Sequence, residues 1–372
     1  MLQKQIVNSP PSSGETNIAA LDGLRGFAAL IVIVSHFSNE TGLWNGLLGR
    51  GAGQTGVMLF FILSGFLMAY LHINQPFTAA NVKQYALRRI ARVYPLFILA
   101  ALLPPVLLAT HFPGGIAMNT ITTFPQYLRQ IALIDRGALV FWTIRIEFLF
   151  YLVFIGIWLV HRTLDRLWAT AGLLLAAIAF LRIHNYNFQI EFFVHVHYFL
   201  FGVLSALMLR HTGKFRNPLL AATSLLLLAA MPLTYPMVWV AFLHHAPIAQ
   251  NDILLVSWRS DVVATLLIAL FNFALRDGRW LSALLSSRPS RWLGKVSYSV
   301  YLLHYFVISA LLSWIPKTAN IAMRFSICLL LILVVAELSN RFVERPLQRL
   351  ILSLPQRLAQ SRRLQAVSQA AD

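Results

Sequence analysis

The stretch that decides the fold runs from residue 21 to residue 37 and reads LDGLRGFAALIVIVSHF. It is apolar enough to enter a bilayer, yet it carries Asp22, Arg25 and His36. A cation inside a membrane helix costs roughly 2.5–3.5 kcal/mol even on the lenient insertion scale, so such residues are functional candidates. Arg25 and His36 are eleven residues apart. Because that spacing is about three helical turns, or roughly 16 Å along the axis, we expect both side chains on one helical face.

The whole chain shares this apolar character. Of its 372 residues, 58% are hydrophobic and only 12% are charged, with a mean hydropathy of +0.68. Soluble domains carry about 25% charged residues, and a soluble core of this size could not cover so much apolar surface. Cys328 is the single cysteine of the sequence, which excludes an internal disulfide framework and a cysteine metal site. The composition therefore predicts an all-α polytopic integral membrane protein.

A membrane span needs about 20 mostly apolar residues. We predict ten transmembrane helices around a central cavity or channel, at residues 18–37, 54–72, 94–111, 138–160, 167–183, 190–209, 218–238, 255–275, 296–315 and 320–340. The polar residues 1–17 lack the features of a cleaved signal and are expected to form a flexible cytoplasmic N-terminal arm. Residues 18–346 then form one transmembrane domain, and residues 347–372 form a basic cytoplasmic C-terminal tail.

The distribution of lysine and arginine predicts the orientation. With the N-terminus in the cytoplasm, inner segments carry 21 of the 30 Lys and Arg residues and outer segments carry 7, while Arg25 and Arg145 lie within spans. Because cytoplasmic loops are the enriched ones, we expect both termini inside a multi-pass protein of the cell (inner) membrane. This bias explains the net charge of +17 without nucleic acid, and it predicts attraction of the inner loops to anionic membrane lipids. Arg25 then lies toward the cytoplasm and His36 toward the outside.

Two segments near the start of the chain carry further candidates. Phe61 and Ser64 lie in the second span, where the small pair Ser64-Gly65 lets a helix or a ligand approach closely. Arg89 and Arg92 precede the third span and share a helical face, and two guanidinium groups side by side suit a polyphosphate. Simple helix packing and an ordinary positive-inside cluster are the respective alternatives.

The fourth span carries Trp142, Arg145 and Glu147. In the predicted orientation Glu147 lies about two turns below the outer surface, close to the expected depth of His36. Its carboxylate is therefore a candidate to accept the second imidazole N–H of His36, which would fix the tautomer and raise the basicity of that ring. A structural ion pair between helices is the alternative for Glu147. Arg145 lies on a different face, where it pairs with another span or reaches outward.

The ninth span carries a polar stripe. Ser297, Tyr301 and His304 recur at i, i+4 and i+7, so the stripe faces the interior of a helix bundle. It either lines the cavity or forms hydrogen bonds between helices. Glu191 and His195 share a face of the sixth span, but the rings of His195 and His197 splay apart, and we expect no metal site.

Together these segments resemble the membrane acyltransferase family 3, the bacterial O-acetyltransferases of surface polysaccharides and related glycans. The matching motifs, in chain order, are Asp22-Gly23-Leu24-Arg25 with His36, Phe60-Phe61 with Ser64-Gly65-Phe66, Arg89 and Arg92 before Tyr94-Pro95, Trp142-Thr143 with Glu147 and Phe150-Tyr151, Ser297-Tyr298 with Tyr301-Leu302 and His304, and Glu344-Arg345-Pro346. Arg145 departs from the small or polar residue expected in the Trp-Ser/Thr segment.

The resemblance implies an enzyme that uses cytoplasmic acyl-CoA, usually acetyl-CoA, to acylate a hydroxyl of a glycan or lipid-linked sugar at the outer side. It implies that Arg89 and Arg92 hold the nucleotide phosphates, that Arg25 and His36 are required, and that envelope biosynthesis proteins are partners. Asp22, Phe61, Ser64, Trp142, Tyr301 and His304 are then expected to line the substrate cavity.

The chemistry follows from these assignments. The phosphates of CoA stay at the inner mouth, while the pantetheine arm carries the thioester toward His36. His36 then acts either as a general base on the acceptor hydroxyl or as a transiently acylated nucleophile, with Glu147 as its orienting partner. A transporter or flippase for glycans or lipid-linked sugars is the alternative, because charges inside spans also mark transport routes. A scaffold in an envelope biosynthesis complex is a third hypothesis.

Overall fold

The computed structural model describes residues 19–43, 48–49, 53–109, 123–135, 137, 140–184, 191–212 and 283–355. The predicted spans at 218–238 and 255–275 and the predicted arm at 1–17 lie outside these residues. The chain forms two compact units. Unit 1 comprises residues 1–35, 44–74 and 166–295, and unit 2 comprises residues 36–43, 75–165 and 296–372.

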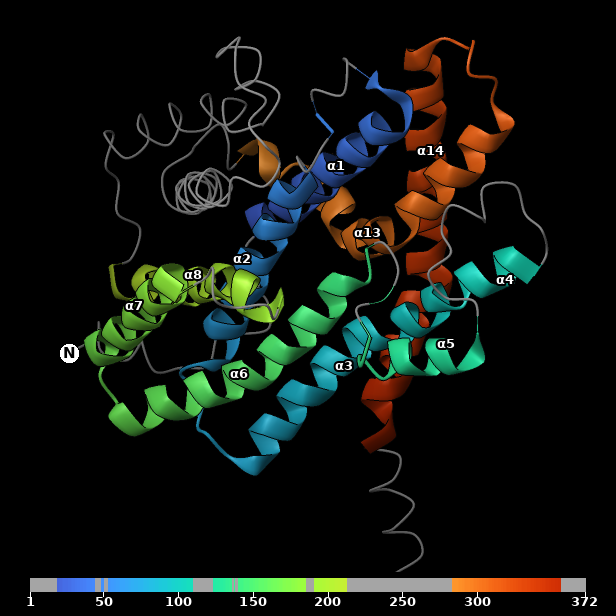
Figure 1. Cartoon of the computed structure of the whole chain (residues 1–372). Helices are drawn as coiled ribbons and strands as arrows, with labels where there is room; N and C mark the ends of the chain where they lie inside the picture. The colour runs from blue at the N-terminus through green and yellow to red at the C-terminus, as the bar shows by residue number, and fades with distance from the viewer. Residues whose placement is uncertain are drawn as a thin grey trace, which may run out of the picture. The chain divides into compact units, whose positions relative to one another are not determined.

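Unit 1 is built on close helix packing. It contains the first part of α1 (Ala19–Thr41), all of α2 (Gly53–His72), α7 (Leu167–His184) and α8 (Glu191–Thr212), and the first residues of α13 (Arg288–Trp314). Helices α2 and α8 cross each other (Figure 1). At the crossing, a Cβ added to Gly65 would overlap the carbonyl oxygen of Phe199, and one added to Gly202 would overlap that of Ile62. Glycine therefore lets the two backbones touch.

Unit 2 holds its helices together with tyrosine hydroxyl groups. It contains α3 (Ala79–Ala101), α4 (Leu103–Ala109), α5 (Phe124–Ile131), α6 (Trp142–Leu164), the rest of α1 and α13, and α14 (Ile321–Ser339). Figure 1 shows α6 beside α3. The hydroxyl of Tyr85 on α3 donates to the carbonyl of Tyr151 on α6 at 3.2 Å. The hydroxyl of Tyr298 on α13 donates to the carbonyl of Val93 on α3 at 2.6 Å.

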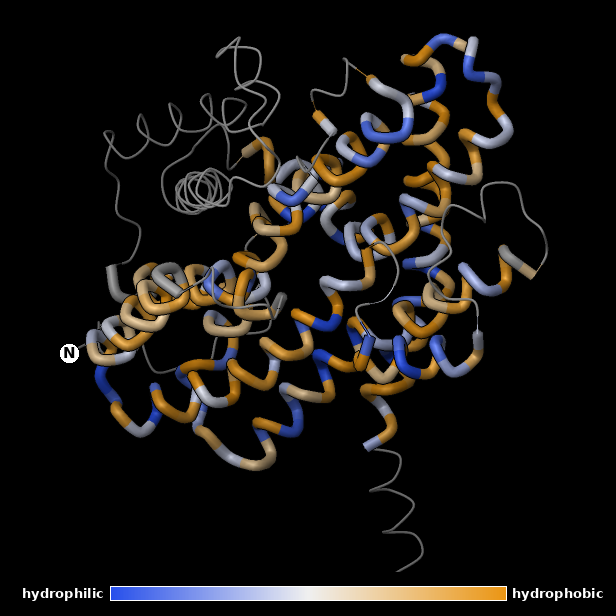
Figure 2. Tube along the Cα trace, in the orientation of Figure 1, coloured by the Kyte–Doolittle hydropathy of each residue, from blue (hydrophilic) through white to orange (hydrophobic). Residues whose placement is uncertain are grey.

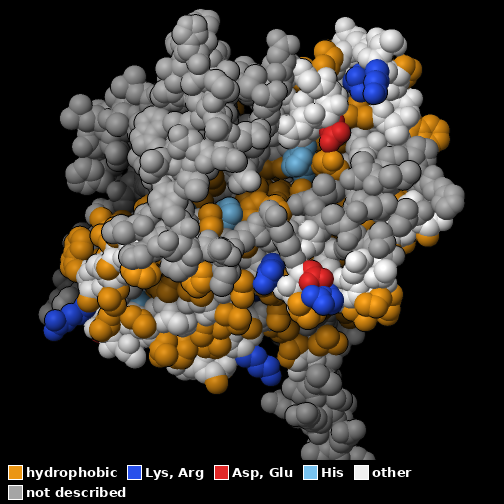
Figure 3. All heavy atoms as spheres, viewed as in Figure 1, with side chains coloured by type: hydrophobic (Ala, Val, Ile, Leu, Met, Phe, Trp, Pro, Cys, Tyr) orange, Lys and Arg blue, Asp and Glu red, His pale blue; other side chains and the backbone are white. Residues whose placement is uncertain are grey.

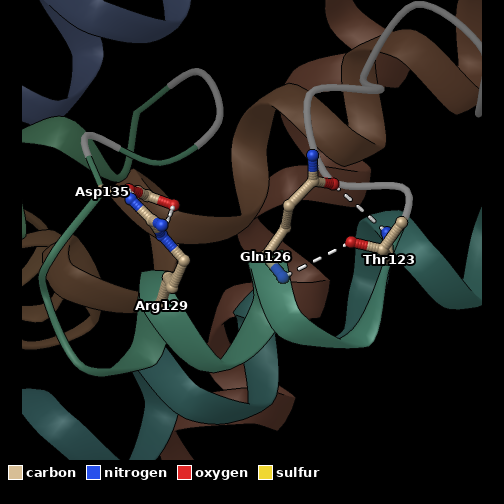
Figure 4. A network of polar contacts seen from close by, with 4 residues as sticks. All are labelled: Thr123, Gln126, Arg129 and Asp135. Carbon is tan, nitrogen blue, oxygen red and sulfur yellow. Dashed lines mark hydrogen bonds and ion pairs between the residues drawn. The ribbon is translucent and has the colours of Figure 1, made fainter.

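Helix α5 is a short amphipathic helix that begins with a capping box. The Thr123 hydroxyl accepts from the Gln126 backbone N–H, and the Gln126 side chain accepts from the Thr123 N–H (Figure 4). Arg129 at its end pairs with Asp135 at 2.9 Å, and this hydrogen-bonded carboxylate raises the pKa of the Arg129 guanidinium. The hydroxyl of Tyr94 donates to the carbonyl of Ile131. These contacts fix the turn after α5 against α3.

A π-helical turn, η6 (Asn340–Glu344), follows α14 directly. The buried carboxylate of Glu344 accepts hydrogen bonds from the Ser299 hydroxyl at 2.9 Å and from the Asn340 side chain at 3.0 Å. Since Ser299 lies on α13, these bonds tie the wide turn to a second helix. The helix then continues to Pro355, into the segment predicted as a tail.

In the part of the chain that the structure describes, seven helices are long and apolar enough to cross a membrane. Their bounds are Ala19–Thr41, Gly53–His72, Ala79–Leu107, Trp142–Leu164, Phe192–Leu209, Arg288–Trp314 and Ile321–Pro355, and α7 adds the shorter apolar helix Leu167–Leu181. Hydrophobic colouring runs along these helices in Figure 2, and hydrophobic side chains cover most of the described surface on the face in Figure 3. These observations agree with a polytopic membrane protein.

The start of the third span differs most from the prediction. The sequence placed the third span from residue 94, whereas the apolar helix begins at Ala79. The hydroxyl of Thr78 caps its start by accepting from the Asn81 N–H at 3.3 Å. Long basic side chains are good helix formers and do not end a helix. Arg89 and Arg92 therefore lie within the long helix rather than before it.

Candidate functional site

His36 and His304 lie together in unit 2. His36 comes from α1 and His304 from α13, and their ring centroids are 5.1 Å apart. His304 has no exposed surface, whereas His36 is partly exposed. The pair therefore offers one imidazole that a substrate reaches and a second imidazole behind it.

The backbone fixes the tautomer of His304. Its Nδ1 lies 2.8 Å from the carbonyl oxygen of Tyr301 and 3.1 Å from that of Val300. Because carbonyl oxygens only accept, Nδ1 must carry the hydrogen. Nε2 then has a lone pair, and this buried atom has no hydrogen-bond partner among the described residues. An unused buried acceptor is rare in proteins and points to a proton or a ligand received there.

Tyr301 lies one turn before His304 on α13. Its hydroxyl donates to the carbonyl of Val140 at 3.2 Å and lies 3.1 Å from the Thr143 hydroxyl. The rings of Tyr301 and His304 are 6.0 Å apart. In the predicted stripe, Tyr301 thus forms hydrogen bonds between helices, and its ring lies beside His304 of the histidine pair.

An acidic group stands beside His36. The Tyr305 ring contacts His36 edge-on at 5.3 Å, and the Tyr305 hydroxyl donates to the Glu40 carboxylate at 2.9 Å. Glu40 is four residues after His36, so the two side chains share a face of α1. A carboxylate at this place stabilises the imidazolium that forms when His36 takes a proton.

The structure places Glu147 beside Tyr151. The Tyr151 hydroxyl donates to the Glu147 carboxylate at 2.6 Å. The rings around His36 belong to His304 and Tyr305. The predicted orientation of His36 by Glu147 therefore stays a prediction.

The predicted donor residues lie on α3. Arg89 lines a recess of about 310 Å³ between α3 and α6, which Arg145 also lines. Arg92 is partly exposed and lies outside the lining of this recess. Arg89 and Arg92 thus have different surroundings. The second arginine of the recess is Arg145, whose role the sequence left open.

Unit 1 carries the other predicted site residues. Asp22 and Arg25 lie on α1. A Cβ added to Gly294 would overlap the backbone carbonyl oxygen of Asp22, so the two backbones lie in close contact. Phe61 stacks on Phe199 at 4.5 Å between ring centroids and contacts the His195 ring at 6.0 Å. Ser64 lies next to the glycine of the α2–α8 crossing. Trp142 belongs to unit 2 and begins α6.

Sequence reasoning assigned no site role to three residues near the histidine pair and Glu147, although Tyr151 was part of a matching motif. Glu40 and Tyr151 each lie four residues after a candidate, so the i, i+4 rule would have found both. Tyr305 follows His304 directly, and its contact with His36 has no signal in the sequence.

These features define the class: a helical membrane protein with paired histidines and arginines set within apolar helices. The chain belongs to the membrane acyltransferase family 3, because residues 18–338 match that family, described as an acyltransferase domain. The resemblance predicted from the motifs is thereby confirmed.

Individual relatives are distant but cover most of the chain. The acyltransferase MdmB of Streptomyces mycarofaciens is 27% identical over 78% of this chain and 79% of its own length. The peptidoglycan O-acetyltransferase OatA of Listeria monocytogenes is 23% identical over 89% of this chain. OatA of Staphylococcus aureus is also 23% identical over 89% of this chain. The chain spans 56–57% of the length of these two OatA proteins. No solved structure matches the chain.

Proposed function

We propose that this membrane acyltransferase transfers an acetyl or other short acyl group from cytoplasmic acyl-CoA to a hydroxyl of a glycan at the outer side of the cell membrane. The acceptor is a surface polysaccharide or a lipid-linked sugar. The observation that carries the proposal is the His36–His304 pair, with its unused buried Nε2, in a chain of an acyltransferase family. The names of OatA and MdmB support acyl transfer over transport.

In this proposal His36 is the catalytic base. It takes the proton of the acceptor hydroxyl while that oxygen attacks the thioester carbonyl carbon. The C–S bond then breaks, an ester forms, and the CoA thiolate leaves and receives the proton from His36. General-base catalysis of this kind contributes about 10²–10⁴-fold.

The other residues assist His36 or hold the donor. Glu40 stabilises the imidazolium, and His304, held through its Nδ1 by the carbonyls of Val300 and Tyr301, acts as a positioning residue. Arg89 and Arg92 hold the phosphates of the donor, and Arg25 assists in donor use. Glu147, hydrogen-bonded by Tyr151, contributes a second carboxylate in unit 2.

The test is transfer of labelled acetyl from acetyl-CoA to the surface glycan by membranes that contain the full chain. We expect His36→Ala to lower this transfer by about 10²–10⁴-fold while binding of CoA to the purified protein is kept. His304→Gln should lower transfer less and shift its pH profile. Arg25→Ala should mainly weaken donor use.

The outcomes separate the hypotheses. Full turnover by His36→Ala would refute the role of the pair. Movement of unmodified glycan without any incorporated label would support the transporter hypothesis instead. Label retained on His36 in the absence of acceptor would replace the general base with an acylated nucleophile.

A further inference from the structure

Arg324 is a buried cation inside an apolar helix. It is the fourth residue of α14, and only 7% of its surface is exposed. The buried residues of this helix recur at steps of four, so they form one stripe that faces the protein interior. They are Arg324, Cys328, Ile332 and Ala336. A guanidinium group thus stands where the rest of the stripe carries a thiol or an aliphatic side chain.

The charge of Arg324 has no acidic partner among the described residues. Its Nε atom is buried without a hydrogen-bond partner, and no ion pair joins its guanidinium group to a described carboxylate. Glu40, an acid near the end of α1, accepts a hydrogen bond from Tyr305. Because a guanidinium group stays charged at every accessible pH, burying it without a counter-charge is costly. Such a residue within a membrane helix points to an anion that is received there.

The start of α14 lies at the level of His36 along α1. The ring of Phe325 contacts the ring of Phe37 at 5.1 Å between centroids. Arg324 and His36 are therefore each one residue away from the same contact, and both belong to unit 2. In the predicted orientation this is the outer end of both helices, opposite the cytoplasmic side from which the donor enters. An anion at Arg324 is thus expected to belong to the acceptor.

The surroundings of Arg324 favour an anion carried by a lipid. Met323 and Leu330 share one face of α14 and are 48% and 63% exposed, so a face that suits lipid hydrocarbon borders the guanidinium group. Arg324 lies about 6 Å along the axis from the Asn320 cap, comparable to the thickness of one headgroup layer. A phosphate that joins a sugar to a lipid chain lies in this layer, whereas a carboxylate on the sugar lies in water.

We propose that Arg324 binds the phosphate of a lipid-linked sugar and so holds the acceptor at the level of His36. The inference rests on the proposed function and narrows its acceptor to a sugar that carries a phosphate next to a hydrocarbon chain. A guanidinium fork binds phosphate oxygens bidentately, and exclusion of water strengthens this bond. The phosphate of an anionic phospholipid has the same chemistry, and the experiment separates the two sources.

The experiment measures binding of farnesyl phosphate, a short isoprenoid phosphate, to the purified full-length chain in phosphatidylcholine nanodiscs. We expect Arg324→Gln to weaken this binding roughly 10- to 100-fold, the loss of a charge-assisted phosphate contact. Binding of farnesol, which has no phosphate, and of acetyl-CoA should be unchanged. Arg324→Lys should lose less, because it keeps the charge without the fork. The control Lys317→Gln removes an exposed cation just before α14 and should leave binding unchanged.

A second variant, Arg324→Met, separates ligand binding from a structural role. A buried cation that receives its anion from a ligand destabilises the empty protein, so an apolar replacement should keep or raise the melting temperature. Farnesyl phosphate should raise the melting temperature of the unmodified protein and not that of Arg324→Met. A lower melting temperature of the empty variant would mean that Arg324 pairs within the protein, and it would overturn the proposal.

The outcomes distinguish this inference from the proposed function. If the unmodified chain transfers no label from acetyl-CoA, the proposed function fails. If it transfers label but binds farnesyl phosphate no better than Arg324→Gln does, only the role of Arg324 fails. The same comparison in nanodiscs with phosphatidylglycerol tests the other source. Loss of bound phosphatidylglycerol from Arg324→Gln, with farnesyl phosphate binding intact, would assign the site to membrane lipid and overturn the proposal.

Discussion

The two units solve the problem of packing apolar helices in different ways. In unit 1, glycines at the α2–α8 crossing bring backbone against backbone, and in unit 2, tyrosine hydroxyl groups bridge helices through single hydrogen bonds. Without a hydrophobic driving force between helices in a bilayer, small residues and polar bridges are the two main means of association. A glycine contact leaves no space between helices, whereas an aromatic bridge keeps them apart.

This difference bears on the histidine pair and the recess, whereas the candidates Asp22 and Arg25 lie on the part of α1 that belongs to unit 1. The recess with two arginines and the histidine pair both belong to unit 2, in which large side chains separate the helices. Among the described residues of unit 1, the predicted candidates Phe61 and Ser64 lie at or beside tight helix packing. Close packing gives a rigid element, and bridged packing gives room for ligands.

The largest loss of stability is expected when a larger residue is placed at the α2–α8 crossing. We expect Gly202→Val to destabilise the protein by about 3 kcal/mol, the upper end of the usual cost of overpacking, because the added carbon overlaps a carbonyl oxygen of Ile62 that cannot move aside as a side chain does. Thermal unfolding of the purified protein in detergent, followed by size-exclusion chromatography, measures this loss.

The control for this change is Gly172→Val on α7, also in unit 1. A Cβ added to Gly172 meets no atom within 4 Å, so the same substitution should leave the melting temperature nearly unchanged. Equal losses in the two variants would show that the crossing is not the tight contact described.

The second test removes a bridge from unit 2. Tyr298→Phe deletes the hydroxyl that donates to the carbonyl of Val93 on α3 at 2.6 Å. Because this removes one hydrogen bond between two helices, we expect a cost of about 1–1.5 kcal/mol, seen as a lower melting temperature. For comparison, Tyr127→Phe removes a bond of 3.4 Å and should cost about 0.5 kcal/mol. A larger loss from Tyr127→Phe than from Tyr298→Phe would contradict the expectation that the Tyr298–Val93 hydrogen bond is the stronger of the two.

The smallest effect is expected at the surface of α5. Arg129 and Asp135 form an ion pair at 2.9 Å, but their side chains are 60% and 38% exposed. Because water and salt screen such pairs, Arg129→Gln should not measurably change the melting temperature. A drop as large as that of Tyr298→Phe would mean that α5 is held by charge rather than by its capping box and its tyrosine bridges.

The sequence predicted most of the described helices because their apolar length is a strong signal. It placed the start of the third span at residue 94, whereas the helix begins at Ala79, because basic side chains continue a helix at little cost. The motifs also predicted the family, which the match over residues 18–338 confirms. Hydropathy could not show that α1 and α13 each contribute residues to both units.

The site was harder to predict because its contacts join helices distant in sequence. The face shared by Tyr301 and His304 was readable from their spacing, but the approach of His304 to His36 depends on how α13 packs against α1. The same holds for Arg145, which was assigned to the fourth span and proves to line a recess with Arg89. The spacing of residues along the sequence shows which of them share a face of one helix, but it does not show which other helix packs on that face.

The π-helical turn at Asn340–Glu344 has a consequence for insertions and deletions in this chain. A π turn is an α-helical turn with one added residue, so deleting one residue between 340 and 344 would restore regular winding. The helix beyond it would rotate by about 100°, and every side chain from Arg345 to Pro355 would face a new direction. Chain length at this point therefore sets the direction of these side chains independently of residue identity, with Ser299 and Glu344 as the pair that holds the extra residue in place.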